Sequence, residues 1–334
     1  MQTPTSFHES AAESAWCTVG IPVYRGMPWL RACMQSLEQQ TFKKFEVLIV
    51  LDGPDRESTI YLASVNKLNL RVIERPHRGL VATLNDLLAE CSTPWLVRQD
   101  ADDLLYPTRL HKLTEAAHDH PRAGLICSRA RYEPRGRAWG RFRSSHGSPF
   151  ALRRAVHAGR LLSFCHSSVA LNVAVAQAVG GYRDIPYSED SDLWWRIALQ
   201  ADIHCLPEVL TGFRQHGQSV SSLHHEAQQI SGLYVQYLLL SSLWGLAPRP
   251  MEEIRDVLAA LVPLHTSHAK HHLREANMAF SARSCLPAAV RLARSLRCDP
   301  MYLPRRIWQE FSPLLQTNGL SPEFFWKEKD RLWA

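Results

Sequence analysis

Residues 45–51, FEVLIVL, form the segment that most restricts how this chain can fold. Every side chain except that of Glu46 is apolar, and the turn DGPD at 52–55 ends the run. A strand that is apolar on both faces is typical of a parallel sheet covered by helices on both sides. The first hundred residues alternate accordingly, with strands predicted at 17–23, 45–51, 70–73 and 95–97 and helices at 29–40, 58–68 and 81–91. We therefore predict an α/β fold with right-handed crossovers.

The character of the sequence changes at about residue 222. Before that point, strands are predicted at 123–129, 167–171 and 205–216, with arginine-rich loops and a short helix over 131–160. After it, helical patterns dominate, at 226–245, 251–262, 267–283 and 287–297. We predict three parts: a flexible N-terminal tail over residues 1–15, a Rossmann-like domain with a mostly parallel sheet over 16–221, and a smaller α-helical domain over 222–334.

The composition limits the partners and the compartment. A formal charge of +6 over 334 residues suits an anionic substrate or an acidic membrane surface, but it is too weak to indicate nucleic acid. The first 15 residues lack the basic and apolar regions of a signal peptide, and no apolar run is long enough to predict a membrane span. The eight cysteines are scattered without a CxxC pair, as is typical of a reducing compartment. We expect a cytoplasmic protein.

Three acids follow the predicted strand at 95–97 almost directly. Asp100, Asp102 and Asp103 lie within the four residues DADD at 100–103. Carboxylates at the end of a buried strand are costly to desolvate unless a positive group binds there. In an extended segment, Asp100 and Asp102 point the same way and could hold Mg²⁺ or Mn²⁺, which often bridges to phosphates. The alternative is a solvated acidic turn that caps the next helix.

A second acidic group, Glu189, Asp190 and Asp192, precedes the predicted helix at 193–200. A carboxylate there could accept the proton of an attacking hydroxyl, or Asp190 could simply cap the helix. For Asp192 we favour a structural role in the first helical turn. His166 suits either a substrate pocket or the core, and Trp194 suits either core packing or stacking on a ligand.

Taken in order, these motifs resemble those of family 2 glycosyltransferases of the GT-A fold, particularly bacterial enzymes of envelope polysaccharide or lipopolysaccharide assembly. The resemblance covers residues 17 to about 221. No single motif is specific, but their order and spacing are. The motifs are IPVY at 21–24, VLDG at 50–53, RGL at 78–80 with Asn85, DADD at 100–103, HSSV at 166–169, GGY at 180–182, EDSDLW at 189–194 and RQH at 214–216.

The resemblance implies a nucleotide-sugar donor, with residues assigned to it by position. Pro22, Val23 and Tyr24 match the segment that lines the nucleobase and ribose. Asp52 matches an acid that accepts a hydrogen bond from the base. Two further residues, Arg78 and Asn85, match the loop and helix beside the donor. Many relatives carry a second acid where this chain has Leu51, and its absence makes the choice of nucleobase less certain. The resemblance to the family is then the only reason to favour UDP over GDP or TDP.

The resemblance also implies an inverting, hexosyltransferase-like reaction that depends on Mn²⁺ or Mg²⁺. Asp102 matches the direct metal ligand, Asp100 faces the ribose or the metal, and His216 completes the metal or diphosphate site. Asp190 matches the catalytic base. Glu189, His166 and Trp194 are expected to support the acceptor. The acceptor would be a saccharide or a lipid-linked saccharide, and the enzyme would then work peripherally at the inner face of the cytoplasmic membrane.

Other functions remain to be compared with this one. A nicotinamide-dependent oxidoreductase needs a glycine-rich turn after its first strand, and this chain has PVYRG at 22–26. No phosphate-binding GxxxxGK[ST] loop is present either. The main rival is a catalytically silent protein of the same fold that binds a nucleotide sugar or a glycan. An interaction protein built on the helical C-terminal half is the third hypothesis.

Overall fold

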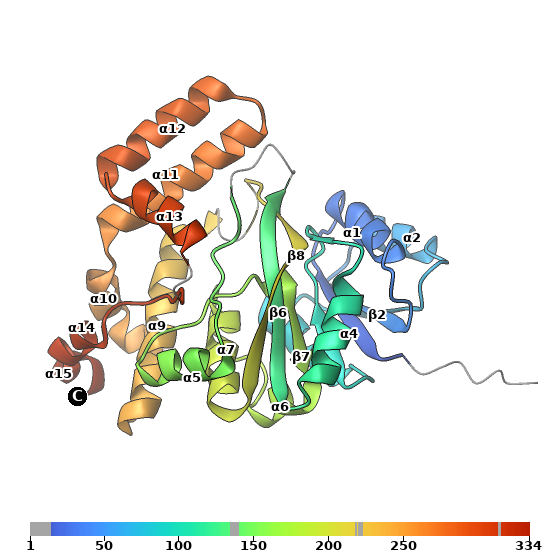
Figure 1. Cartoon of the computed structure of the whole chain (residues 1–334), viewed down its shortest axis with the longest axis horizontal. Coiled ribbons are helices and arrows are strands. Elements are labelled where there is room, and N and C mark those ends of the chain that lie inside the picture. Colours follow the sequence, from blue (N-terminus) through green and yellow to red (C-terminus); the bar gives the residue numbers. More distant parts are fainter. Residues whose placement is uncertain (1–14, 134–139, 218, 220–222, 313–314) are drawn as a thin grey trace, which may run out of the picture.

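The computed structural model describes residues 15–133, 140–217, 219, 223–312 and 315–334 (Figure 1). Most of the expected tail, and Arg135 and Arg137 of the arginine-rich stretch, lie outside these residues. Within them, one eight-stranded sheet has the order β3-β2-β1-β4-β7-β6-β8-β5. Its strands are β1 (Cys17–Val23), β2 (Phe45–Asp52), β3 (Leu70–Arg75), β4 (Trp95–Arg98), β5 (Leu104–Leu105), β6 (Ala123–Glu133), β7 (Val169–Asn172) and β8 (Asp202–Arg214).

The sheet is mostly parallel, as the apolar strands predict. Strands β3, β2, β1 and β4 run parallel, and so do β6 and β8. Between the two groups lies β7, antiparallel to both β4 and β6, and β5 is antiparallel to β8. The carboxyl ends of β1, β2 and β4 therefore meet at one edge, where ligands bind in open α/β sheets. This edge brings residues 22–24, Asp52 and the acidic stretch together.

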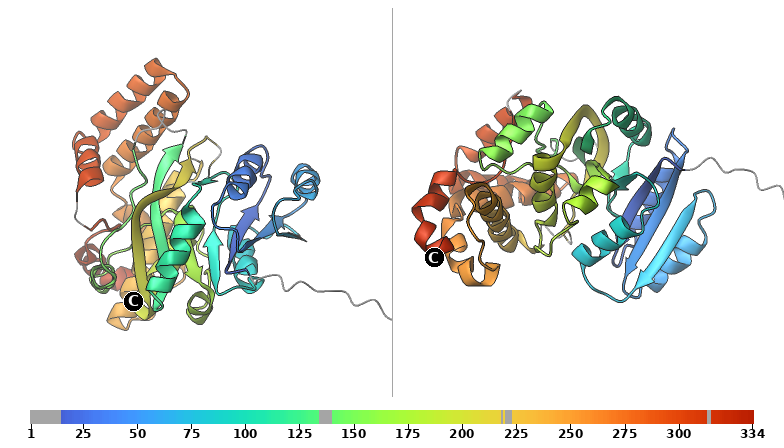
Figure 2. Two further views of the ribbon diagram at one scale, coloured as in Figure 1. Left: turned by 45° about the vertical axis from the view of Figure 1, so that its right-hand side comes forward. Right: turned by 90° about the horizontal axis from the view of Figure 1, so that it is seen from below.

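Helices cover both faces of the sheet (Figure 2). Alternation along β2 shows the two faces: Val47 and Ile49 belong to one apolar core, whereas Leu48 and Val50 belong to the other. The first core receives α1 and α4, and the second receives α3, α5, α6 and α7. The bounds are α1 (Trp29–Glu38), α2 (Arg56–Ala63), α3 (Leu80–Ala89), α4 (Arg109–Asp119), α5 (Pro149–His157), α6 (Val173–Ala178) and α7 (Glu189–Gln200).

The C-terminal part is helical, as predicted, and α9 joins it to the sheet. Val235 and Leu239 of α9 pack into the core that contains α7, whereas Leu233 and Tyr237 pack into a separate C-terminal core. Helices α11 and α12 form a hairpin at the upper left of Figure 1. The bounds are α9 (His225–Trp244), α10 (Met251–Leu261), α11 (Leu264–Ser281), α12 (Cys285–Cys298), α13 (Tyr302–Phe311), α14 (Pro322–Lys327) and α15 (Lys329–Trp333). Helices α13 to α15 were not predicted.

The structure also corrects some element boundaries. Ser167 and Ser168 lie in a short 3₁₀ turn, η1 (His166–Ser168), rather than in the predicted strand, which begins at Val169. The hydroxyl of Ser168 donates to the carbonyl of Cys165 at 2.8 Å, and such local bonds compete with strand pairing. The predicted helix at 58–68 spans Arg56–Ala63. Among the described residues, no helix has the length and apolar character needed to cross a membrane.

Candidate active site

A buried arginine fixes Asp100 at the end of β4. The guanidinium of Arg98, whose residue is only 1% exposed, donates to Oδ1 of Asp100 at 2.5 Å, and the hydroxyl of Ser167 donates to Oδ2 at 2.7 Å. Burial opposes ionisation of Asp100, but the charge of Arg98 together with the hydrogen bonds from Ser167 and Arg98 keeps the pKa of this carboxyl below its usual value. Asp100 is therefore a fixed negative charge, and both of its oxygens already accept hydrogen bonds.

Asp102 points elsewhere and pairs with the histidine that follows β8. Its Oδ2 lies 2.9 Å from Nε2 of His216. About a third of the Asp102 side chain is exposed. Asp103 is fully buried, and its Oδ1 accepts a hydrogen bond from the backbone N–H of Arg214 at 2.8 Å. The acidic stretch thus positions the end of β8, so that His216 meets Asp102.

Asp52, at the end of β2, holds the loop that leads into α3. Its Oδ1 accepts from the N–H of Arg78 at 2.8 Å, and its Oδ2 accepts from the N–H of Gly79 at 3.0 Å. The ring of His77, 2.9 Å from the same carboxylate, stacks on Tyr24 with centroids 4.5 Å apart. Tyr24 is 53% exposed. The end of β1, the end of β2 and this loop therefore form one wall beside the acidic stretch.

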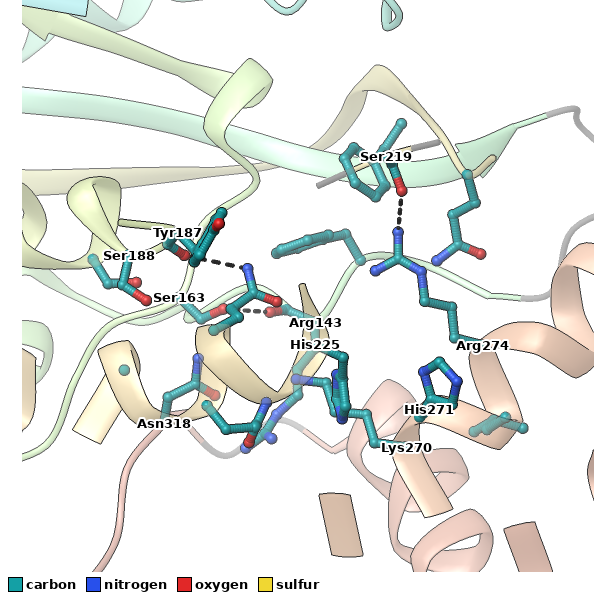
Figure 3. A pocket seen from close by; sticks show the side chains of 18 of the residues that line it. Arg143, Ser163, Tyr187, Ser188, Ser219, His225, Lys270, His271, Arg274 and Asn318 are labelled. Carbon is teal, nitrogen blue, oxygen red and sulfur yellow. Dashed lines mark hydrogen bonds between the residues drawn. The ribbon is translucent and has the colours of Figure 1, made fainter. Parts of the chain in front are cut away.

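A cavity of about 1430 Å³ joins the two acidic groups predicted from the sequence. Arg78, Asp100 and Asp102 line one part of it, and Glu189 and Asp190, in the first turn of α7, line another. Residues of α9, α11, α12 and α13 line a further part, so the C-terminal helices help to enclose the cavity. Figure 3 shows part of this lining, including Tyr187 and Ser188 immediately before α7.

Burial shifts the titration of the groups around α7. It raises the pKa of Glu189 to about 8, helped by the charge of Asp190, and it raises the pKa of Asp190 to about 6. The N–H of Ser191 donates to Oδ1 of Asp190 at 2.5 Å, which favours its ionised form. Burial, with the charge of Arg98, lowers the pKa of His166 to about 3. At neutral pH, the first turn of α7 therefore holds an ionised Asp190 and a protonated Glu189, beside the neutral imidazole of His166.

The structure corrects three predicted placements. Trp194 is fully buried and packs against Phe164 with centroids 6.3 Å apart, so its ring cannot stack on an acceptor. Asn85 does not line the cavity; instead, its amide bonds both the N–H and the carbonyl of Tyr182, at 2.9 and 2.8 Å. Val23 is buried in the sheet core, so only its backbone can face a ligand.

The surroundings of Asp192 and His166 bear on the roles that the sequence suggested for them. Asp192 is structural: it is fully buried and accepts from Nε and Nη2 of Arg196 at 2.9 and 2.6 Å. His166 lies between its two possible roles, in an acceptor pocket and in the core, because it lines the cavity yet is hydrogen-bonded to the hydroxyl of Tyr182 at 3.0 Å.

Arg98 is a residue of the site that was not predicted. An arginine inside the apolar strand at 95–98 is nevertheless a signal in the sequence for a buried carboxylate partner.

Comparisons with known proteins identify the family of the sheet domain. Residues 18–180 match the family model described as glycosyl transferase family 2. An uncharacterised glycosyltransferase of Haemophilus influenzae is 29% identical over 199 residues, which are 58% of this chain and 73% of that protein. The amylovoran biosynthesis glycosyltransferase AmsE of Erwinia amylovora is 29% identical over 203 residues, with the same two coverages.

Solved structures show the same fold. TarS of S. aureus in complex with UDP-GlcNAc aligns with a TM-score of 0.52 and 14% identity, over 83% of this chain and 90% of that one. The mannosyltransferase PcManGT of Pyrobaculum calidifontis, in complex with GDP-Man and Mn²⁺, aligns with a TM-score of 0.53 and 20% identity, over 89% and 84%. These neighbours are GT-A glycosyltransferases. A glycosyl transferase family 2 domain therefore spans residues 18–180, and the structure has the GT-A fold.

Proposed function

We propose that this glycosyltransferase moves a sugar from a nucleotide-sugar donor to a hydroxyl of a glycan or lipid-linked saccharide in cell-envelope polysaccharide synthesis, with inversion at the anomeric carbon. One observation carries this proposal: Asp102 and Asp190, assigned to opposite ends of the reaction, line a single cavity. The relation to an enzyme of amylovoran biosynthesis supports the polysaccharide assignment.

Asp190 is the proposed base. The acceptor oxygen forms a bond to the anomeric carbon, the bond from that carbon to the diphosphate breaks, and the hydroxyl proton passes to the carboxylate of Asp190. Direct displacement of this kind inverts the configuration. With a pKa of about 6, Asp190 is mostly ionised at pH 7 yet still basic enough to accept a proton. Glu189, with its pKa of about 8, stays protonated and can donate a hydrogen bond to the acceptor.

The residues that follow β4 and β8 fit a divalent cation. Asp102 offers a partly exposed carboxylate and His216 an imidazole, a pair that suits Mn²⁺ somewhat better than Mg²⁺. Among the described residues, no group of three His, Cys, Asp or Glu side chains could hold a metal. Diphosphate oxygens and water would therefore complete the shell. A bound cation would neutralise the charge that develops on the leaving diphosphate. Asp100 is the weaker candidate for a ligand, because Arg98 and Ser167 occupy its oxygens.

UDP is the favoured donor nucleotide by resemblance, and calorimetry tests it. UDP, GDP and TDP are titrated with and without Mn²⁺ into the wild-type protein and Asp102→Asn. Binding of one nucleotide that needs the metal and is lost in the variant is expected. No metal-dependent binding of any of the three would overturn the donor site. Tight binding without turnover of any donor sugar would instead favour the rival, a catalytically silent binding protein.

Helix α13 suggests contact with an anionic membrane. Ile307 and Trp308 are 46% and 59% exposed, and Arg305 is exposed beside them. Apolar side chains with neighbouring cations are typical of helices that lie in a membrane interface. Such contact would bring a lipid-linked acceptor to the cavity, and α13 itself lines the cavity through Arg306 and Ile307.

A further inference from the structure

Four cations line the part of the cavity that the C-terminal helices form. Arg143 precedes α5, Lys270 and Arg274 stand one turn apart on α11, and Arg306 is on α13. We call these four residues the basic pocket. Figure 3 shows Lys270 and Arg274 on α11, with Arg143 on the neighbouring segment and Arg274 bonded to Ser219. None of the four belongs to the donor wall or to the two acidic groups.

Among the side chains that the structure describes, none forms an ion pair with the basic pocket. The hydrogen bonds found for its guanidinium groups within this set go to neutral oxygens: Arg143 donates to the carbonyl of Thr317 at 2.8 Å, Arg274 to the hydroxyl of Ser219 at 2.9 Å, and Arg306 to the carbonyl of Arg141 at 2.7 Å. The Nε atoms of Arg143 and Arg274 are buried and have no hydrogen-bond partner among the described residues. Donor capacity therefore remains available for an anion.

The charges in the basic pocket oppose one another. Lys270 is an exposed residue of the cavity wall, and desolvation by the surrounding atoms, followed by the positive charges of Arg143, Arg274 and Arg306, lowers its pKa to about 8. Burial also lowers the pKa of Arg143 and of Arg274. Like charges on one helix face at positions i and i+4 are unfavourable unless an opposite charge lies between them. A bound anion would relieve this repulsion.

Phosphate is the anion whose chemistry fits best. Guanidinium groups match two phosphate oxygens at once, and an ammonium group adds a compact positive charge. Tyr302 and Tyr132 line the same cavity and can donate from their hydroxyl groups. A single carboxylate would use fewer of these donors.

The location indicates the acceptor rather than the donor. Lys270, Arg274 and Arg306 lie outside residues 18–180, which match the family model. Tyr187, which precedes the proposed base, lies in the same cavity, and Gln228 of α9 donates to its carbonyl at 3.3 Å. The volume of about 1430 Å³ exceeds that of ordinary single-ligand pockets, which span roughly 300–1,000 Å³. It has room for a donor and part of an acceptor.

We propose that the basic pocket binds a phosphate-bearing group of the acceptor, and so holds the acceptor hydroxyl toward Asp190. The shared chemistry is a phosphate or diphosphate ester, carried either by a soluble saccharide or by a lipid. This inference rests on the transferase function proposed above, because an acceptor is needed only if sugar is transferred.

Calorimetry with inorganic pyrophosphate tests the pocket directly. The titration is made on the full chain in EDTA without nucleotide, because the donor site is expected to bind a diphosphate only when Mn²⁺ is present. The double variant Lys270→Gln/Arg274→Gln should bind pyrophosphate about tenfold more weakly or worse, because two charge-assisted contacts are lost. The control Arg294→Gln/Arg297→Gln removes two exposed cations of α12 that do not line the cavity, and it should bind like the wild type. Thermal unfolding of each variant checks that it is folded.

The outcomes separate this proposal from the transferase function. Equal pyrophosphate affinity in the double variant and the wild type would overturn the pocket. A matching loss of nucleotide affinity in the double variant would also overturn it, since the cations would then serve the donor diphosphate. Asp190→Asn should abolish transfer but retain pyrophosphate binding, so failure of transfer alone leaves the pocket supported.

Two further probes identify the source of the phosphate. Glucose 1-phosphate represents a soluble acceptor, and geranyl diphosphate represents a lipid-linked one. Both should lose affinity in the double variant. If geranyl diphosphate binds more tightly than inorganic pyrophosphate, apolar residues such as Leu273 and Leu292, which line the cavity near the basic pocket, contact the chain of a lipid. If it binds no more tightly, the acceptor phosphate belongs to a soluble saccharide. Binding of neither probe to the wild-type protein would overturn the acceptor assignment.

Discussion

Nε2 of His216 lies 2.9 Å from Oδ2 of Asp102, although 114 positions separate the two residues. His216 follows β8 and Asp102 follows β4, so this contact forms only when the carboxyl ends of both strands are in place. These two side chains are the proposed ligands of the cation, and the first prediction addresses them.

Removal of either partner should weaken metal-dependent nucleotide binding. We expect Asp102→Asn and His216→Ala each to lower Mn²⁺-dependent affinity by about tenfold or more, because a carboxylate or an imidazole is lost from the shell. Calorimetry at a fixed Mn²⁺ concentration measures this. Asp119→Asn, which changes an exposed acid at the end of α4, is the matched control. Full Mn²⁺-dependent binding in both site variants would show that the metal sits elsewhere.

Removal of the proposed base should reduce turnover but not donor binding. Asp190→Asn is expected to lower kcat by about 10²- to 10⁴-fold, the usual contribution of a positioned base. In the wild type, kcat should fall as the pH drops below about 6, because protonated Asp190 cannot accept a proton. Asp184→Asn alters another acid of the same cavity and should leave kcat nearly unchanged. A kcat in Asp190→Asn equal to that of the wild type would remove the assignment.

The buried pair of Asp192 and Arg196 should matter for stability instead. Asp192→Asn leaves the Arg196 charge without its partner and should lower the free energy of unfolding by about 3 kcal/mol. Urea denaturation measures the loss. The double variant Asp192→Leu/Arg196→Leu removes both charges and should recover part of it. If Asp192→Asn unfolds at the wild-type urea concentration yet loses turnover, Asp192 belongs to the reaction.

Glu189 should make the protein less stable as the pH rises. Its folded pKa of about 8 lies above the ordinary value near 4.5, so its contribution to stability is present at low pH and is lost as the pH rises through about 8. Glu189→Gln should therefore be more stable than the wild type at pH 9, by about 1 kcal/mol or more, and the difference should shrink at pH 5.5. Urea denaturation at both pH values tests this, with exposed Glu226→Gln as the control. The same difference at both pH values would contradict it.

Membrane contact through α13 is tested by flotation with vesicles. Ile307→Ser/Trp308→Ser should bind anionic vesicles about tenfold more weakly, because two apolar side chains no longer leave water. Trp326→Ser removes an exposed tryptophan from α14 and should not change binding. No flotation of the wild-type protein with vesicles of phosphatidylcholine and phosphatidylglycerol would contradict the membrane proposal.

The parts of the site that follow from local patterns could be predicted. Asp102 and Asp190 each stand where an apolar or helical segment begins or ends, and these positions are visible in the sequence. The partners of these residues could not be predicted, because they depend on packing. Asn85 meets Tyr182 across 97 positions. The side chain of Trp194 could not be placed either, since residues 192–198 of α7 are buried on every side and show no amphipathic pattern.

The shared position of α9 limits how this protein can be divided. Val235 and Leu239 complete the core above the sheet, while Leu233 and Tyr237 of the same helix complete the C-terminal core. A chain cut at residue 221 would leave the apolar surface around α7 open to water. A chimaera that exchanges the acceptor-side helices for those of a relative should therefore keep α9 with the sheet and place the junction after Trp244.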